Sequence, residues 1–292
     1  MSTTFALPRT AARSEQLTAA SQRLTLDPFT DVDWERPIDD SAFHLPPEFL
    51  SLYGTDAWSA MSEAEQITYS RHEMAALCGA AIWFENALMQ IVLGHLVHID
   101  VKDPMHRYLL IEVADECRHS SMFGEYIRRG GTPAYGPTRP LALDQSAEGR
   151  ALSYLLILAI EELLDYANRI SMRDERVHAT SRQIAKLHVM EEARHVSFAK
   201  TYLAEIWPAL ADAEREIVIS AAPDLIGAIV SLSLDPAVFD ELGIDNGFEI
   251  ARANPNYCAH VVAGLGKLTT FLGGLGVIAD RTRWVELGLV AT

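Results

Sequence analysis

The stretch HVMEEARH, residues 188–195, decides the fold because it spaces three metal-binding side chains at intervals of four and three residues. On an α-helix these intervals return to one face, so His188, Glu192 and His195 project together. Bundles that hold metal ions between their helices carry such sets of inward-facing side chains. The stretch therefore predicts a helix that contributes to a metal site.

A second copy of the pattern lies upstream as DECRH, which places Glu116 and His119 one helical turn apart. Four-helix bundles hold a dinuclear iron or manganese site with a Glu-x-x-His motif from each of two helices and a glutamate from each of the other two. This arrangement requires one further carboxylate in an apolar helix ahead of each motif. Glu85 fills the first place, and Glu161 or Glu162 fills the second.

These additional carboxylates lie in strongly apolar surroundings. Hydrophobic residues flank Glu85 on both sides, and the hydrophobic run 154–160 precedes the Glu161-Glu162 pair. A carboxylate buried in such a place costs several kcal/mol unless it is protonated, paired or bound to a cation. Several of them in one place therefore indicate a bound metal.

The whole chain reads as all-α, because it shows neither a βαβ alternation nor a strand-like period of two. We expect a ferritin-like four-helix bundle with helices over about residues 62–99, 103–129, 144–177 and 180–206. Ser62 and Glu65 form a capping box at the start of the first helix, and Asp103-Pro104 opens the second. The proline-containing segment 132–143 is the expected crossover between the two halves of the bundle.

Two further regions flank this bundle. Residues 1–60 are rich in Pro, Asp and Ser, which disfavours a long helix and predicts an extended arm packed on a helical domain of residues 61–292. The tail after residue 211 is expected to form two or three more helices, broken at Pro223, at Pro236 and at Asn254-Pro255.

The composition limits the function. A formal net charge of −16 argues against nucleic-acid binding, which needs a basic face. Three cysteines without a zinc-binding spacing predict a reducing cytoplasm, with Cys117 as a buried thiol. The polar N-terminal residues show no signal-peptide pattern. The apolar stretch 261–279 contains a lysine and five glycines, so we expect a buried helix, with a possible role as a homodimer face, and no membrane span.

Together these motifs resemble the ferritin-like diiron carboxylate superfamily, and more closely its para-aminobenzoate N-oxygenase family. Most of the superfamily has four carboxylates and two histidines. The N-oxygenase family adds a third histidine one turn before the second Glu-x-x-His, where this chain has His188. The segment 27–34, rich in Asp and containing Trp34, is also similar to the arm that precedes the bundle in that family. The resemblance covers roughly residues 25–280.

The resemblance implies seven metal ligands and a centre of two iron ions that reacts with O2, with manganese as an alternative for one iron. Glu161 is preferred over Glu162 because its distance before His188 matches the family better, although helix phase alone leaves both open. The implied ligands are Glu85, Glu116, His119, Glu161, His188, Glu192 and His195.

Two acids, Asp115 and Glu191, each lie four residues before the histidine of their own motif. At that spacing a carboxylate can accept the ring N–H that does not face the metal, which fixes the ring tautomer. Arg118 and Arg194 can then neutralise these acids. The alternative is that the four residues form ordinary helix ion pairs that face solvent.

The resemblance implies an oxygenase that converts a small arylamine through the hydroxylamine to a nitroso or nitro product. An external reductase or another electron donor must serve it, because the glycine-rich segments 264–266 and 273–276 lack the strand–turn–helix context of a dinucleotide site. Lys267 is a candidate partner for a substrate carboxylate, against the alternative that its ammonium lies in solvent. Competing functions are a diiron hydroxylase or desaturase of another substrate, and an iron-storage or ferroxidase protein.

Overall fold

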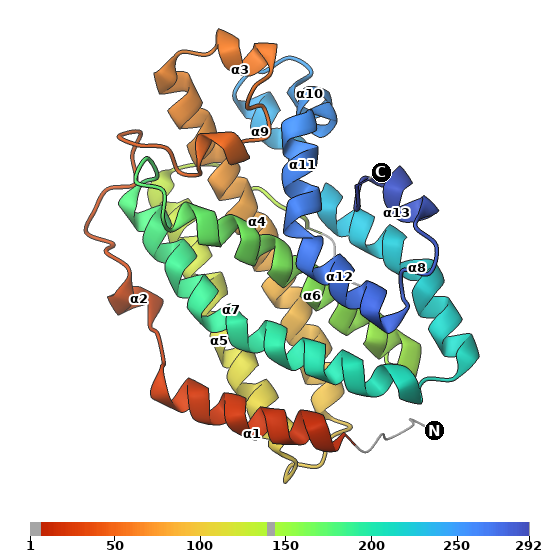
Figure 1. Cartoon of the computed structure of the whole chain (residues 1–292). Helices are drawn as coiled ribbons and strands as arrows, with labels where there is room; N and C mark the ends of the chain where they lie inside the picture. The colour runs from red at the N-terminus through yellow and green to blue at the C-terminus, as the bar shows by residue number, and fades with distance from the viewer. Residues whose placement is uncertain (1–6, 139–143, 292) are drawn as a thin grey trace.

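Four long helices form the body of the protein (Figure 1). The computed structural model describes residues 7–138 and 144–291, and within these ranges it contains helices and one isolated β-bridge, between Phe43 and Val177. The bundle helices are α4 (Glu63–Leu96), α5 (Pro104–Gly130), α6 (Ala147–Ser171) and α7 (Ala179–Ile206). The prediction of an all-α, ferritin-like bundle is confirmed.

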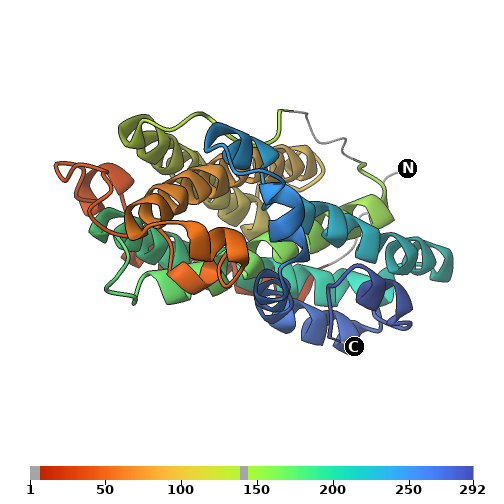
Figure 2. The same cartoon turned by 90° about the horizontal axis from the view of Figure 1, so that it is seen from above.

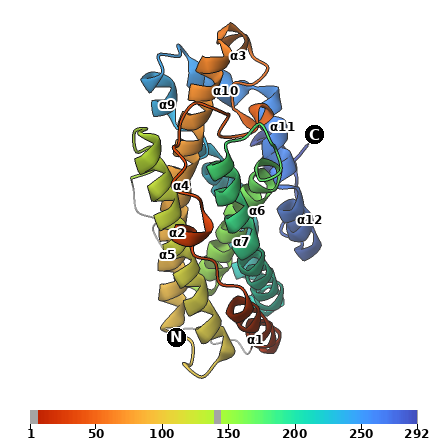
Figure 3. The ribbon, with the colours of Figure 1, turned by 90° about the vertical axis from the view of Figure 1, so that its left-hand side faces the viewer.

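The bundle consists of two helix pairs, in which α4 packs along α5 and α6 packs along α7. Figure 3 shows the two pairs beside each other along the long axis of the molecule, and Figure 2 shows them from above. The crossover from α5 to α6 joins the pairs, and its residues 139–143 lie outside the described part of the chain. This arrangement turns one face of each of the four helices toward a common centre.

Local sequence sets the starts of the first two bundle helices. The Ser62 hydroxyl accepts a hydrogen bond from the Glu65 backbone N–H, and the Glu65 carboxylate accepts one from the Ser62 N–H. These reciprocal bonds satisfy two of the N–H groups that a helix start leaves unpaired. Asp103 caps α5 in the same way by accepting from the N–H of Met105, with Pro104 at the first helical position. Both helices therefore begin where the sequence predicted.

The N-terminal arm packs on the body, but its first part is helical and not extended as predicted. Pro8–Arg23 forms the 16-residue helix α1, which lies across α5 and α7. Proline disfavours the interior of a helix and is tolerated in the first turn. Pro8 occupies that turn, and the next proline of the arm is Pro28, so nothing interrupts α1. The arm continues through α2 (Pro28–Asp31), η1 (Pro47–Phe49) and α3 (Asp56–Ala60).

The C-terminal tail contains more helices than the two or three expected. After η2 (Trp207–Ala209) come α8 (Asp212–Ser231), α9 (Pro236–Glu241), α10 (Gly247–Ala253), α11 (Pro255–Gly264), α12 (Gly266–Leu275) and α13 (Thr282–Glu286). The expected break at Pro223 is wrong, because α8 runs through it. Pro236 and Pro255 each start a helix, as proline at the first position allows. Helices α8, α11 and α12 all pack against α6.

The stretch 261–279, expected to be one buried helix, is broken. Helix α11 ends at Gly264, α12 begins at Gly266, and the two axes differ by 49°. By length and composition alone, α4 and the segment 212–241 could cross a membrane, as could the α11–α12 pair if it is counted as one span. Within the protein, 61% of the apolar window of α4 and 33% of that of segment 212–241 are buried.

Candidate metal centre

The inner faces of α4, α5, α6 and α7 bring all seven predicted ligands into one buried cluster. Each of the seven side chains is at most 2% exposed. Donor atoms of Glu85, His119, His188 and Glu192 lie within 4.8 Å of one another, as do those of the carboxylate group Glu85, Glu116 and Glu161. The neighbouring α5 position, Cys117, faces away from this cluster and is exposed, so the expectation of a buried thiol there is wrong.

The histidines of the two Glu-x-x-His motifs face the cluster through Nδ1. His119 Nδ1 lies 2.7 Å from Glu116 Oε2 and 3.0 Å from Glu192 Oε1. His195 Nδ1 lies 2.8 Å from Glu116 Oε1 and 2.8 Å from Glu192 Oε2. Glu116 and Glu192 therefore lie between the two rings, where both carboxylates would hold the metal ions together with His119 and His195.

The third histidine, His188, faces the cluster through its other ring nitrogen. Its Nε2 lies 3.5 Å from Glu85 Oε1 and 3.7 Å from Glu192 Oε1. Burial lowers the pKa of His188 to about 4, so the ring is neutral at pH 7, which is the form that binds metals. Its Nδ1 lies 3.2 Å from the side-chain amide nitrogen, Nδ2, of Asn168 on α6. A ring that binds metal through Nε2 carries its proton on Nδ1, so Asn168 must then present its amide oxygen.

Several donor atoms of the cluster have no hydrogen-bond partner among the described residues. Buried polar atoms are almost always paired, and an unpaired one costs about 1–3 kcal/mol. Carboxylate oxygens and a ring nitrogen that converge on one point without hydrogen-bond partners fit bound cations. Four carboxylates and three imidazoles are a donor set that suits two iron or manganese ions. Among the described residues, the unpaired atoms of the cluster are Glu85 Oε1, Glu161 Oε2 and His188 Nε2.

The electrostatics of the cluster also favour cations. Burial, together with the charges of nearby carboxylates, raises the pKa of both Glu85 and Glu161 well above the ordinary range. Burial acts in the same direction on Glu192, but the charges of the nearby histidines and the hydrogen bonds from His119 and His195 together outweigh it, and the pKa of Glu192 is lowered. The carboxylates therefore compete for protons at short range. Two divalent cations would remove this competition by neutralising all of them.

The outer nitrogens of the motif histidines are held by acids from the opposite helix. His119 Nε2 lies 2.9 Å from Glu191 Oε2 on α7, and His195 Nε2 lies 3.2 Å from Asp115 Oδ2 on α5. The prediction paired each histidine with the acid of its own motif, four residues earlier. Because α5 and α7 face each other across the bundle, each acid reaches the ring of the other motif instead. Each contact favours the tautomer that leaves Nδ1 free for a metal.

Two arginines neutralise these acids. Arg118 pairs with Asp115 and lies 3.7 Å from Glu191 Oε1. Arg194 Nη2 lies 3.2 Å from Asp115 Oδ2 and 3.4 Å from Glu191 Oε1. Both acids are buried, so the alternative of ion pairs that face solvent is wrong for them.

The adjacent acids Glu161 and Glu162 separate in the structure. Glu161 turns toward Glu85 and Glu116 in the cluster. Glu162 turns away from it and forms an ion pair with Lys200 of α7. The preference for Glu161 as the ligand therefore agrees with the geometry.

Lys267 does not have the surroundings predicted for a substrate contact. Its Nζ donates a hydrogen bond to Asp165 Oδ2 at 3.0 Å and lies 3.8 Å from Glu162 Oε2. The side chain is 63% exposed. The protein's own carboxylates thus pair with this ammonium at the surface of α6.

Glu112 also joins the cluster, although it is not one of the seven predicted ligands. It is fully buried one turn before Glu116 on α5, and neither of its oxygens has a hydrogen-bond partner among the described residues. One of these oxygens lies within 4.8 Å of donor atoms of Glu116 and His195. Burial raises the pKa of Glu112 to about 8. Its spacing of four from Glu116 was a signal, but the metal-site template was already complete without it.

The family model described as p-aminobenzoate N-oxygenase AurF matches residues 8–276. The chain belongs to this family. Uncharacterized proteins of Mycobacterium tuberculosis and Mycobacterium bovis are each 29% identical to it over 212 residues. The match covers 68% of this chain and 62% of the length of those relatives.

A solved structure of another protein has a similar fold. It is a valine-to-isoleucine mutant of an R2-like ligand-binding oxidase with an aerobically reconstituted Mn/Fe cofactor. The two chains align with a TM-score of 0.53 and 12% sequence identity, over 90% of this chain and 93% of the oxidase. At this identity the likeness concerns the fold alone, and it agrees with the ferritin-like bundle described above.

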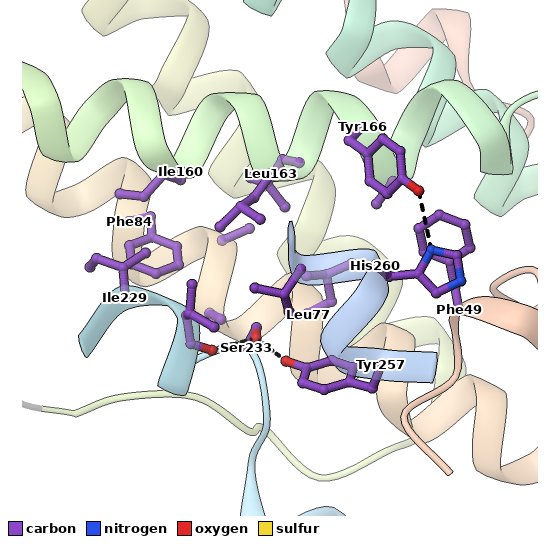
Figure 4. Close-up of a pocket in the computed structure, with 16 residues that line it drawn as sticks. Phe49, Leu77, Phe84, Ile160, Leu163, Tyr166, Ile229, Ser233, Tyr257 and His260 are labelled. Carbon is purple, nitrogen blue, oxygen red and sulfur yellow. Dashed lines mark hydrogen bonds between the residues drawn. The ribbon is translucent and has the colours of Figure 1, made fainter. Parts of the chain in front are cut away.

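In this AurF family member an apolar cavity of about 120 Å³ lies beside the cluster, between α4, α6, α8 and α11 (Figure 4). Ala81 lines it and precedes Glu85 by one turn of α4, while Leu164 lines it and follows Glu161 by about one turn of α6. Residues one turn apart on a helix lie about 5–6 Å apart along its axis. The cavity is therefore placed to hold a small molecule next to two of the carboxylates.

Proposed function

We propose that this protein is an oxygenase with a dinuclear metal centre that oxidises the nitrogen of an arylamine, through the hydroxylamine to a nitroso or nitro product. The observation that carries the proposal is the buried cluster of four carboxylates and three imidazoles with unpaired donor atoms. Membership of the AurF family supports nitrogen as the atom oxidised. The apolar cavity beside the cluster supports a small organic substrate.

The seven clustered side chains would hold two iron ions, or one manganese and one iron. When bound, these metals supply the redox chemistry that activates O2. The rest of the site acts on the ligands and the substrate. Asp115 and Glu191 hold the rings of His195 and His119 in one orientation. The apolar cavity keeps water away from the substrate nitrogen.

The first oxidation has a defined balance. One atom of O2 enters the N–H bond of the amine to form the hydroxylamine, and the other leaves as water. Two electrons and two protons must therefore be supplied for each turnover. We include a separate reductase in the proposal, because no strand–turn–helix nucleotide site occurs in residues 7–138 and 144–291.

The test combines metal analysis with product analysis. The purified chain is loaded anaerobically with Fe(II), and we expect about two metal ions per chain, as the template predicts. It is then given an aniline panel, a chemical reductant and ¹⁸O2, and products are identified by mass spectrometry. Label in a hydroxylamine, nitroso or nitro product supports the proposal. Label on carbon, or hundreds of irons per particle without a labelled product, refutes it.

A matched pair of variants on α5 ties the product to the cluster. Glu116→Gln removes a carboxylate that lies between two histidine rings and should abolish labelled product. Glu125→Gln removes a carboxylate that pairs with Arg128 and Arg129 near the end of the same helix and should leave the product unchanged. Equal activity in both variants would show that the cluster is not the site of oxidation.

A further inference from the structure

We infer that the substrate is an uncharged amine of about one aromatic ring, without a carboxylate, and that it binds in the apolar cavity beside the cluster. The inference rests on the proposed function and specifies the substrate class of that site. Such a substrate differs from p-aminobenzoate, the compound in the description of the family, because p-aminobenzoate carries a negative charge at neutral pH.

The first argument is the charge of the cavity wall. Sixteen residues line the cavity, and none of them is Asp, Glu, Lys or Arg. Figure 4 shows apolar side chains such as Phe84, Ile160 and Ile229 at one end. His260 is the titratable base in this wall, and burial lowers its pKa, so it is neutral at pH 7. The wall thus offers no counter-ion to a carboxylate.

The polar groups of the wall are already paired with each other. Tyr166 Oη lies 3.2 Å from His260 Nδ1, and Ser233 Oγ lies 2.6 Å from Tyr257 Oη. Figure 4 shows the Tyr166–His260 pair at the end opposite Phe84. A neutral hydrogen-bonding group on the substrate can exchange with such pairs, whereas a carboxylate needs a cation or several N–H donors.

A neighbouring cavity gives no better place for a carboxylate. It also measures about 120 Å³ and shares Ser233 and Tyr257 with the first, so a substituent that extends beyond one ring would enter it. Its other lining residues include the acids Glu73 and Asp235 and neither Lys nor Arg. Asp235 already accepts a hydrogen bond from the Gly136 N–H at 2.8 Å. Both cavities therefore discriminate against an anion.

The size of the first cavity sets the size of the ligand. An apolar protein cavity of about 150 Å³ admits benzene. A space of about 120 Å³ therefore suits one ring with a small adjustment of the wall. The proposed oxidation requires the amine on that ring to point toward Glu85 and Glu161 and away from the Tyr166–His260 pair.

The unmodified, iron-loaded chain tests the charge preference directly by isothermal titration calorimetry. The ligands are p-toluidine and p-aminobenzoate, which share a ring and an amine and differ in one charged group. A carboxylate that binds without a counter-ion must first take up a proton, which costs about tenfold in affinity for each pH unit above its pKa. At pH 7 we therefore expect p-aminobenzoate to bind at least about 100-fold more weakly than p-toluidine.

The pH dependence provides a second readout. Between pH 6 and 8 the apparent affinity for p-aminobenzoate should fall by about 100-fold, because its neutral form becomes rarer, while that for p-toluidine stays constant. Comparable affinity for the two ligands at pH 7 would overturn the inference. So would the same flat pH profile for both.

A cavity-filling variant locates the binding. Ile229→Trp fills the end of the cavity from α8, which carries none of the predicted ligands, and should weaken p-toluidine binding at least about tenfold. The control Ile217→Trp changes a 48% exposed residue of the same helix and should not affect it. Unchanged binding in Ile229→Trp would refute the assignment to this cavity. If p-toluidine binds as expected but yields no oxidised product, the proposed function fails while the charge preference stands.

Discussion

Replacement of two adjacent glutamates should have opposite effects on metal binding and on stability. Glu161 turns into the cluster and has an unpaired oxygen, whereas Glu162 turns out and pairs with Lys200. We therefore predict that Glu161→Gln weakens metal binding and stabilises the metal-free protein. Glu162→Gln should leave metal binding unchanged and destabilise the protein. The two changes are chemically identical and one residue apart, so each controls for the other.

The expected magnitudes follow from the surroundings of each side chain. Loss of an outer partner of a metal ligand costs about 10- to 100-fold in metal affinity, so loss of the ligand Glu161 should cost at least about 100-fold, or about 2.7 kcal/mol. Burial and the charges of Glu192 and Glu85 raise the pKa of Glu161 well above its usual range. A neutral amide removes that conflict and should stabilise the metal-free fold by about 1–3 kcal/mol. Glu162→Gln replaces the charged partner of Lys200 with a neutral acceptor, at a cost of about 1–3 kcal/mol.

Two measurements decide the outcome. Metal affinity is measured anaerobically by competition with a chromophoric Fe(II) chelator, and stability is measured by chemical denaturation of the metal-free proteins. Metal affinities that fall equally in the two variants would contradict the assignment of Glu161. A metal-free Glu161→Gln protein that is less stable than the unchanged chain would contradict the electrostatic argument.

Three further predictions concern other parts of the chain. Asp115→Asn should lower metal affinity about 10- to 100-fold by loosening a histidine ring, and unchanged iron stoichiometry and turnover would rule this role out. Burial lowers the pKa of His44 to about 4, so the contribution of His44 to stability should be constant above pH 6.5 and fall by about 3 kcal/mol as the pH drops to 4. His44→Gln should flatten this part of the slope in acid denaturation, and a change at exposed His98 should not. Gly79→Ala would place a methyl group against the backbone of the crossover loop and should destabilise the protein by at least about 1–3 kcal/mol. The control Gly124→Ala lies in open space on α5 and should stabilise the protein by about 0.5–1 kcal/mol. Equal melting temperatures of the two variants would contradict this prediction.

The parts of the site that the sequence predicted correctly depend on distances within single helices. The capping box at Ser62 involves neighbours in the chain, and so does the face shared by Glu116 and His119. The four-helix template then supplied the count of carboxylates, and the family resemblance implied that His188 is a third histidine ligand. The prediction of an extended arm was wrong because it used the proline content of all sixty residues. A helix needs only an interior without proline, and α1 has one.

Other features of the site depend on how helices meet. Asp115 contacts His195, and Glu191 contacts His119, so each acid holds the histidine of the other motif. This pairing follows from the approach of α5 and α7, and no spacing within one motif encodes that approach. The separation of Glu161 from Glu162 likewise depends on the rotation of α6 about its axis. Adjacent residues point 100° apart around a helix axis. A predicted helix boundary is uncertain by one or two residues, so it cannot decide which of the two glutamates faces the cluster.

By itself, the sequence determined that this chain forms a helical bundle with carboxylates and imidazoles at positions that share helix faces. Helix periodicity is a local property, so it can be read from spacing alone. Only the tertiary structure decided that Glu112 joins these groups, that Lys267 stays at the surface, and that the cavity beside the cluster lacks a charged wall. Those facts depend on contacts between segments far apart in the chain, whose register and rotation are set by packing of the whole core.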